Sequence, residues 1–233
     1  MPRPEDSFNY PVYPGTDEWA SLMSGTERTA VCQVPECILR KMSTQAVIQA
    51  IWEMPLCGNS LIVLLGYFQN AIESDIRRYN SFEELTKRED AGPALLERLT
   101  VVDPLTFIPH ESSVLELLLS RDVFLSQLNE SEMRRTVEIS LINDDIRTAA
   151  WDAGTRQYAQ PATWILIGKT MFAAGYEPFM KAVNENEQLK DFIDGWMPDY
   201  YDPNKRISYF YIESVYGNIP QLIIDYSKDY IND

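Results

Sequence analysis

Helix-start signals recur along the whole chain and limit its possible folds more than any other feature. The pairs that carry them are Ser24 and Glu27, Ser81 and Glu84, Ser113 and Glu116, Asn129 and Glu132, and Asn184 and Glu187. In each pair the first side chain can accept a backbone N–H, and the carboxylate can return to the cap residue. The sequence therefore predicts a mainly α protein, an irregular array of about eight to ten helices.

Apolar residues repeat at steps of three and four over long segments. One stripe runs through residues 61–79, and residues 130–153 are expected to form the longest helix. Within the second segment, the side chains expected to face the core are Met133, Val137, Leu141, Ile142, Ile146, Ala149 and Ala150, with Glu138, Asp144 and Asp145 facing out. Residues 161–174 are apolar nearly all round, which is typical of a helix at the centre of the core.

Both ends of the chain depart from this helical pattern. Residues 1–15 hold four prolines and predict an extended arm, whereas residues 16–233 are expected to form a single helical domain. Near the C-terminus, β-favouring residues flank Gly217-Asn218, which predicts a short β hairpin over residues 207–226. A pair of helices is the alternative, because Pro220 restricts the second strand to an edge or a later start.

The charge balance excludes some classes of partner. The chain has 20 Lys and Arg against 35 Asp and Glu, a formal net charge of -15. Such a surface repels phosphate backbones, so no nucleic-acid partner is expected. No apolar run is long enough to be a transmembrane segment, and residues 1–6 do not resemble a signal peptide. We expect a monomer or a weak dimer, either cytoplasmic or cut after a removed signal.

Metal and cofactor motifs are missing from the sequence. Cys32, Cys37 and Cys57 lack CxxC spacing and are expected to be small buried side chains, with a Cys32–Cys37 disulfide as the alternative. A single histidine cannot build a multi-histidine site, and the oxygen-rich stretch 191–204 lacks the EF-hand pattern. No Walker lysine or GxGxxG motif occurs. We therefore expect no metal site and no cofactor.

His110 is the one weak catalytic candidate. It precedes a helix start near Ser112 and Ser113, where an imidazole could act as a base, but no GxSxG motif accompanies it. The paired carboxylates Asp144-Asp145 and Glu83-Glu84 point about 100° apart on a helix, so neither pair can flank one bond. A hydrolase that uses His110, or a carboxylate pair assembled by the fold, is the alternative to a binding function.

The segment 196–202 is the first binding candidate. Its residues Trp196, Tyr200 and Tyr201 are interleaved with Asp199 and Asp202. Aromatic rings stack on apolar sugar faces and carboxylates accept hydroxyl groups, although the same rings could simply pack against helices. We therefore interpret the chain as a non-enzymatic binding protein with a protein or glycan partner.

Two stretches carry a resemblance to a known group of proteins. The residues PVYPGTDEWASL, followed by CQVPECILRKMST, resemble the start of a helical module in uncharacterised, often exported proteins of gut bacteria. The tail SVYGNIPQLI resembles the short strand element that closes such proteins. The resemblance implies a mainly helical fold and an exported, cell-envelope setting. It implies no activity and no catalytic residues.

Overall fold

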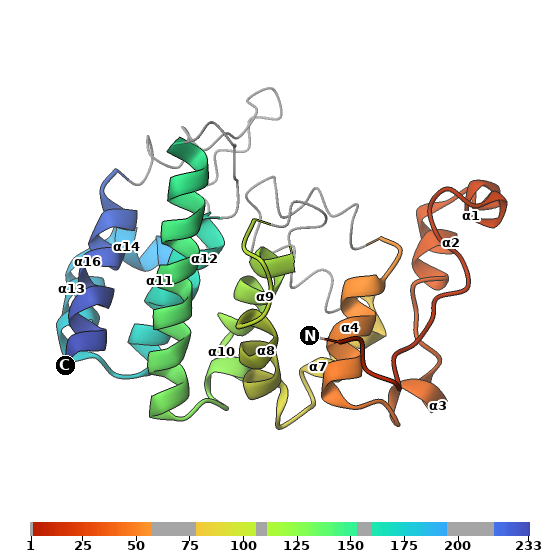
Figure 1. Cartoon of the computed structure of the whole chain (residues 1–233), viewed down its shortest axis with the longest axis horizontal. Helices are drawn as coiled ribbons and strands as arrows, with labels where there is room; N and C mark the ends of the chain where they lie inside the picture. The colour runs from red at the N-terminus through yellow and green to blue at the C-terminus, as the bar shows by residue number, and fades with distance from the viewer. Residues whose placement is uncertain (1, 57–77, 106–110, 153–159, 195–216) are drawn as a thin grey trace.

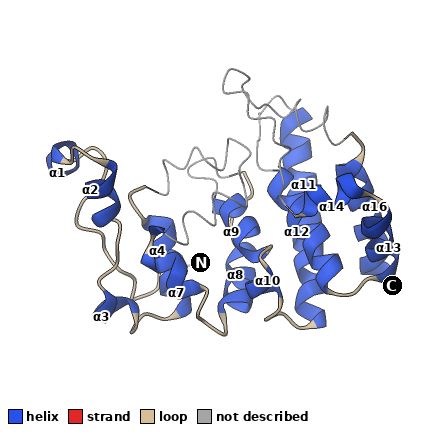
Figure 2. Ribbon diagram, turned by 180° about the vertical axis from the view of Figure 1, so that it is seen from behind, coloured by secondary structure: helices blue, strands red, loops and turns tan. Residues whose placement is uncertain are grey.

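The protein is built from helices. A computed structural model describes residues 2–56, 78–105, 111–152, 160–194 and 217–233. These residues contain thirteen helices and no strand, so the expected mainly α fold is confirmed. The helices outnumber the eight to ten expected because several, such as α3 and α10, are only four residues long. Figure 2 shows the same arrangement from behind, with helices and loops distinguished.

The helices form a row that follows the order of the chain (Figure 1). The first part of the row contains α1 (Asp17–Ser21), α2 (Gly25–Ala30), α3 (Glu36–Leu39), α4 (Thr44–Glu53), α7 (Asn80–Leu85), α8 (Ala91–Leu99), α9 (Glu111–Leu119) and α10 (Asp122–Leu125). The other part contains α11 (Glu130–Asp152), α12 (Gln160–Ala173), α13 (Glu177–Glu185), α14 (Glu187–Ile193) and α16 (Ile219–Asn232). As expected, α11 is the longest helix among the described residues.

Helix α12 is the centre of the second part of the row, as its apolar sequence predicts. It packs against α9, α10, α11, α13, α14 and α16, and its buried side chains include Trp164, Leu166 and Ile167. The chain turns away after α12 at Gly175, whose φ of 71° is available to glycine without strain. The N–H groups of Gly175 and Tyr176 donate to carbonyls in the last turn, which is a Schellman ending.

Two of the predicted helix starts are confirmed. The Ser24 hydroxyl accepts the N–H of Glu27, whose carboxylate returns to the N–H of Ser24 at 2.9 Å. Asn129 and Glu132 make the same reciprocal pair, at 3.0 and 2.8 Å. These capping boxes open α2 and α11 and fix where each helix begins.

The other three predicted starts are wrong. Ser81 lies inside α7, and Ser113 and Glu116 both lie inside α9, where the pattern cannot act as a cap. The cap of α14 is Asn186 instead of Asn184, and its side chain accepts the N–H of Leu189 at 3.1 Å. The same residue spacing occurs within helices, so the spacing alone does not mark a helix start.

The predicted C-terminal hairpin is not supported. Residues 219–226, expected as its second strand, belong to α16, while residues 207–214 lie outside the described part of the chain. Pro220 stands in the first turn of α16, where a missing N–H costs no hydrogen bond. The buried side chains of α16 recur at helical spacing and are Ile219, Ile223, Ile224, Ser227 and Tyr230. Packing of this face overrides the β-propensity of the β-branched residues.

The N-terminal arm lies against α4. Residues 2–15 contain no helix and turn at residues 5–6 and 14–15. Arg3 forms an ion pair with Glu53 at 2.7 Å, and the Tyr10 hydroxyl donates to the carbonyl of Ala50 at 3.0 Å. Asp6 accepts the backbone N–H of Ser43, the cap residue of α4, at 2.5 Å. These contacts hold both ends of α4 to the arm.

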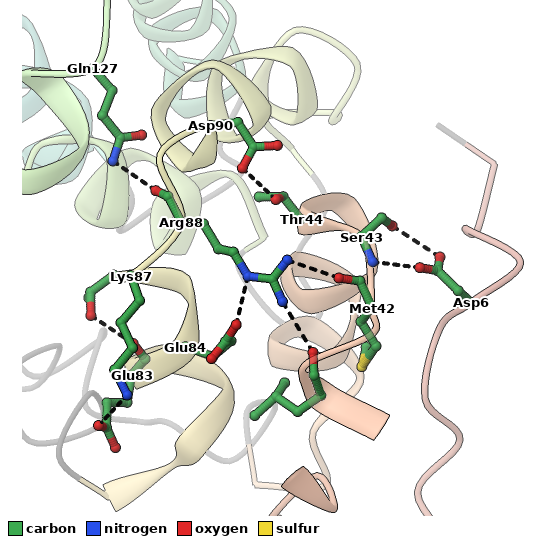
Figure 3. Close-up of polar contacts among 12 residues, drawn as sticks. Asp6, Met42, Ser43, Thr44, Glu83, Glu84, Lys87, Arg88, Asp90 and Gln127 are labelled. Atoms are coloured by element: carbon green, nitrogen blue, oxygen red, sulfur yellow. Dashed lines mark hydrogen bonds and ion pairs between the residues drawn. The ribbon is translucent and has the colours of Figure 1, made fainter. Parts of the chain in front are cut away.

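Arg88 joins three turns in the first part of the row (Figure 3). Its guanidinium donates to Glu84 at 2.7 Å and to the carbonyls of Met42 and Leu39 at 3.0 and 3.2 Å. Its own carbonyl accepts from the side chain of Gln127 at 3.0 Å. The network links the start of α4, the end of α7 and the turn after α10. Its polar groups are paired within the protein, which makes it a structural cross-link.

Candidate functional site

The residues singled out from the sequence as site candidates lie outside the described residues. They are His110, Trp196, Asp199, Tyr200, Tyr201 and Asp202. A catalytic role for His110 and a binding role for the aromatic segment therefore stay predictions.

The strongest candidate site among the described residues is a cleft between α10, α12, α13 and α14. It has a volume of about 540 Å³. Its lining residues are Asp122, Leu125, Ser126, Met133, Lys169, Phe172, Ala173, Val183, Asn184, Lys190, Ile193 and Asp194. The volume falls in the range of about 300–1,000 Å³ that is usual for ligand sites. Helices α12, α13 and α14 lie in the second part of the row, and α10 is the last helix of the first part (Figure 1).

The floor of the cleft is apolar. Leu125, Val183 and Ile193 are buried side chains of three different helices. Phe172 stands beside them on α12 with 39% of its surface exposed. An exposed ring next to a buried apolar floor offers contact area that is removed from water when a ligand binds. The cleft can therefore hold an apolar group.

The mouth of the cleft carries charges of both signs. Lys169 is the one charged residue of α12, and its Nζ lies 3.4 Å from Oδ1 of Asp122 and 3.6 Å from Oδ1 of Asp194. Asp122 is the first residue of α10, and Asp194 caps the C-terminus of α14. The ammonium thus bridges two helices across the cleft, and polar groups surround the apolar floor.

A second polar group of residues is fully buried where α9, α11 and α12 meet. The Arg147 guanidinium donates to both carboxylate oxygens of Glu116, at 3.1 and 3.0 Å. Arg147 also donates hydrogen bonds to the hydroxyls of Ser112, at 2.6 Å, and Thr163. Glu116 accepts two further hydrogen bonds, from Thr163 at 3.1 Å and from Asn143 at 3.3 Å. Burial raises the pKa of Glu116, and Arg147 opposes this rise. Because the hydrogen bonds and charges of these buried residues are paired within the group, we interpret the group as structural.

This buried group corrects the predicted orientation of α11. Ile142, expected to face the core, is 57% exposed, and Ile146 is also exposed. Val137 is fully buried as predicted, but the buried face continues with the polar residues Ser140, Asn143 and Arg147 at steps of three and four residues. Helix α11 is rotated relative to the expectation because Arg147 pairs with Glu116.

Asp144 was expected to face solvent but is half-buried against Trp164. The indole Nε1 donates to Oδ1 of Asp144 at 2.8 Å. Loss of hydration raises the pKa of Asp144 from 3.8 to about 6, with the Trp164 hydrogen bond acting in the opposite direction. Asp144 does not line the cleft described above. Glu83 and Glu84 form i,i+4 ion pairs with Lys87 and Arg88, as helix-surface residues do.

Replacing Asp144 with asparagine is expected to make stability less dependent on pH. The folded protein keeps the Asp144 proton up to about pH 6, whereas the unfolded chain loses it near 3.8, so this residue lowers stability as pH rises between these values. We expect Asp144→Asn to raise the free energy of unfolding at pH 7.5 by about 1–2 kcal/mol, after allowance for partial exposure, and to leave it unchanged near pH 4. Urea unfolding at both pH values measures this, with the exposed Asp145→Asn as the control. A loss of stability at pH 7.5 contradicts the expectation.

The cysteine predictions are partly confirmed. Cys32 is buried, and burial raises the pKa of its thiol to about 11. Cys37 is exposed, contrary to expectation, and both thiols are free, which rules out the Cys32–Cys37 disulfide in this structure. Cys57 lies outside the described residues.

No group of three or more His, Cys, Asp or Glu side chains is placed to hold a metal ion in the part of the chain that the structure describes. Among the described helices, none combines the length and the apolar character needed to cross a membrane.

Comparisons of the chain with protein-family models, with curated proteins and with solved structures found no match. The resemblance to exported proteins of gut bacteria, and the cell-envelope location that it implies, therefore stay predictions.

The sequence does contain a signal for the residues that were missed. Lys169 stands alone among apolar residues in WILIGKTMF, and Glu116 stands alone in VLELLLS. An isolated charge in an apolar helix requires either a buried partner or a nearby opening to water. Glu116 has a buried partner, Arg147, and Lys169 lies at the mouth of the cleft. Assigning which is which requires the positions of the neighbouring helices.

Proposed function

We propose that this is a non-enzymatic binding protein that holds an apolar side chain of a partner protein in the cleft between α10, α12, α13 and α14. The observation that carries the proposal is the combination of an apolar floor, an exposed Phe172 and a charged mouth in one cleft. Apolar anchors inserted into pockets with polar rims contribute most of the energy at protein interfaces.

The distribution of shifted carboxylates supports binding over hydrolysis. Catalytic acids and bases are expected to combine a perturbed pKa with access to a cleft. Glu116 and Asp144 have raised pKa values, but neither lines the cleft. Glu116 is also fully buried against Arg147. Hydrolysis by His110 stays an alternative prediction from the sequence.

Filling the cleft is expected to weaken partner binding. Ala173 lines the cleft and is exposed, so Ala173→Trp places an indole in the cleft without disturbing a buried contact. The probe is a phage library of random dodecapeptides, selected on the immobilised wild-type protein. We expect apolar-anchored peptides to be enriched, and their binding to Ala173→Trp to fall by at least about tenfold, since the anchor contributes several kcal/mol.

The matched control is Ala20→Trp. Ala20 is an exposed alanine of α1, at the far end of the row from the cleft (Figure 1). This variant should bind the selected peptides as the wild type does, and both variants should keep the wild-type circular dichroism spectrum. The proposal fails if no peptide is enriched, or if the enriched peptides bind Ala173→Trp as tightly as Ala20→Trp.

A further inference from the structure

Two lysines and two aspartates line the cleft, but the two carboxylates share the ammonium of one lysine. A single ammonium, that of Lys169, is shared by the carboxylates of Asp122 and Asp194 at 3.4 and 3.6 Å. Both distances are longer than those of a close charge-assisted hydrogen bond, about 2.7–2.9 Å. The side chains of Asp122 and Asp194 are 89% and 41% exposed. Each carboxylate therefore keeps oxygen lone pairs that another donor can reach.

We infer, resting on the function proposed above, that the partner segment in the cleft is basic, with an apolar residue flanked by lysine or arginine. The apolar residue lies on the floor beside Phe172, and a flanking cation binds Asp122 or Asp194. Such a cation completes an alternating arrangement in which each carboxylate has its own positive partner. Arginine suits this role because its guanidinium binds a carboxylate through two parallel hydrogen bonds.

The net charge of the chain favours the same partner. A formal charge of -15 creates a negative potential that attracts cationic segments and repels anionic ones. Complementary charge raises the rate of association and selects among partners. The negative potential of the whole chain therefore favours a basic partner, as the carboxylates of Asp122 and Asp194 do.

Apart from Lys169, Lys190 is the only cation among the residues that line the cleft, and its charge disfavours a basic ligand. It is exposed on α14, and a long flexible stem allows its ammonium to remain in water. Lys169, in contrast, lies on α12 between the two carboxylates, and an anionic ligand could reach it only by displacing them. The remaining lining residues are uncharged. An anionic segment is therefore the weaker fit.

Three synthetic peptides test the inference. Each has a central Leu-Phe pair and differs only in its flanking residues, which are two lysines, two glutamines or two glutamates. Fluorescence anisotropy with the full chain at low salt measures the affinities. We expect the lysine peptide to bind about tenfold more tightly than the glutamine peptide, and the glutamate peptide most weakly, with the differences decreasing as salt screens the charges.

Two pairs of substitutions locate the effect. In Asp122→Asn/Asp194→Asn, the preference for lysine over glutamine should fall to less than about threefold, because the local charges are gone. The control Asp17→Asn/Asp145→Asn removes the same net charge from exposed positions away from the cleft lining, and should keep most of the preference.

The outcomes separate this inference from the proposed function. If the glutamate peptide binds as tightly as the lysine peptide, or if the Asp122/Asp194 variant keeps the full preference, the inference is overturned. Equal binding of all three peptides that is lost in Ala173→Trp overturns the inference and leaves the proposed function standing. If no peptide binds, the inference also falls, while the library selection decides the proposed function separately.

Discussion

Replacing Glu116 with glutamine is expected to lower the free energy of unfolding by about 3–5 kcal/mol, because the buried Arg147 guanidinium loses its counter-charge. Arg147 and Glu116 are both fully buried, so bulk solvent does not reach the guanidinium to replace the lost carboxylate. Total stability is on the order of 5–15 kcal/mol for a typical domain, so this one change removes a large fraction of it. Urea unfolding followed by circular dichroism measures the loss.

The double variant Glu116→Leu/Arg147→Met provides the internal check. Removing both charges leaves no unpaired ion, so the double variant should be more stable than Glu116→Gln. Glu83→Gln is the matched control, because Glu83 forms an exposed ion pair with Lys87 at 2.7 Å. That change is expected to cost less than about 1 kcal/mol. If Glu116→Gln is as stable as Glu83→Gln, Glu116 is already protonated in the folded protein and the ion pair does not exist.

Replacing Gly92 with alanine is the second change expected to have a large effect. A Cβ at this position of α8 would lie 2.3 Å from the carbonyl oxygen of Phe124 and 3.1 Å from Cβ of Gln127. The first contact is with backbone, so α8 and α10 must separate to relieve it. The N–H of Gly92 also donates to the side chain of Gln127 at 2.6 Å, and separation lengthens this bond. We expect a loss of about 1–3 kcal/mol, as for other overpacked sites.

Gly25→Ala is the control for that substitution. Gly25 also lies in a helix, but a Cβ there meets no atom within 4 Å. Because alanine restricts the unfolded chain and favours helix, this variant should be as stable as the wild type or more stable, by up to about 1 kcal/mol. Thermal unfolding of both variants measures the difference. Equal stability of the two variants would show that α8 and α10 do not approach as closely as described.

The helical class and the central helix could be predicted from sequence because they depend on local patterns. The capping boxes at Ser24 and Asn129, the Gly175 ending and the all-round apolar surface of α12 are properties of short segments. Local hydrogen bonds and the helical period determine these features without reference to distant residues. The predicted starts at Ser24 and Asn129 and the central place of α12 are confirmed.

The orientation of α11 could not be predicted from apolar periodicity. Its apolar stripe points partly to solvent, with Ile142 and Ile146 exposed, because the partner of Arg147 lies on another helix. The prediction of a C-terminal hairpin was wrong for a related reason. The β-branched residues of 219–226 indicated strands, but their helical spacing places Ile219 and Ile223 in the same buried face. Tertiary packing decided both cases.

The cleft could be predicted least, since its lining comes from five separate stretches of the chain between Asp122 and Asp194. No two of its floor residues Leu125, Val183 and Ile193 belong to the same helix. The one local signal is Lys169, an isolated cation in an apolar helix. That signal identifies an unusual position but not the two carboxylates that share the ammonium.

The most direct test of the binding site is the methyl NMR spectrum of protein labelled at isoleucine, titrated with the lysine-flanked peptide. Ile193 lines the cleft, whereas Ile142 and Ile146 are exposed on α11 and do not line it. We predict that the Ile193 methyl signals shift with peptide concentration and that those of Ile142 and Ile146 stay in place. Shifts at Ile142 and Ile146 with an unchanged Ile193 would place the binding surface on α11 and contradict the account.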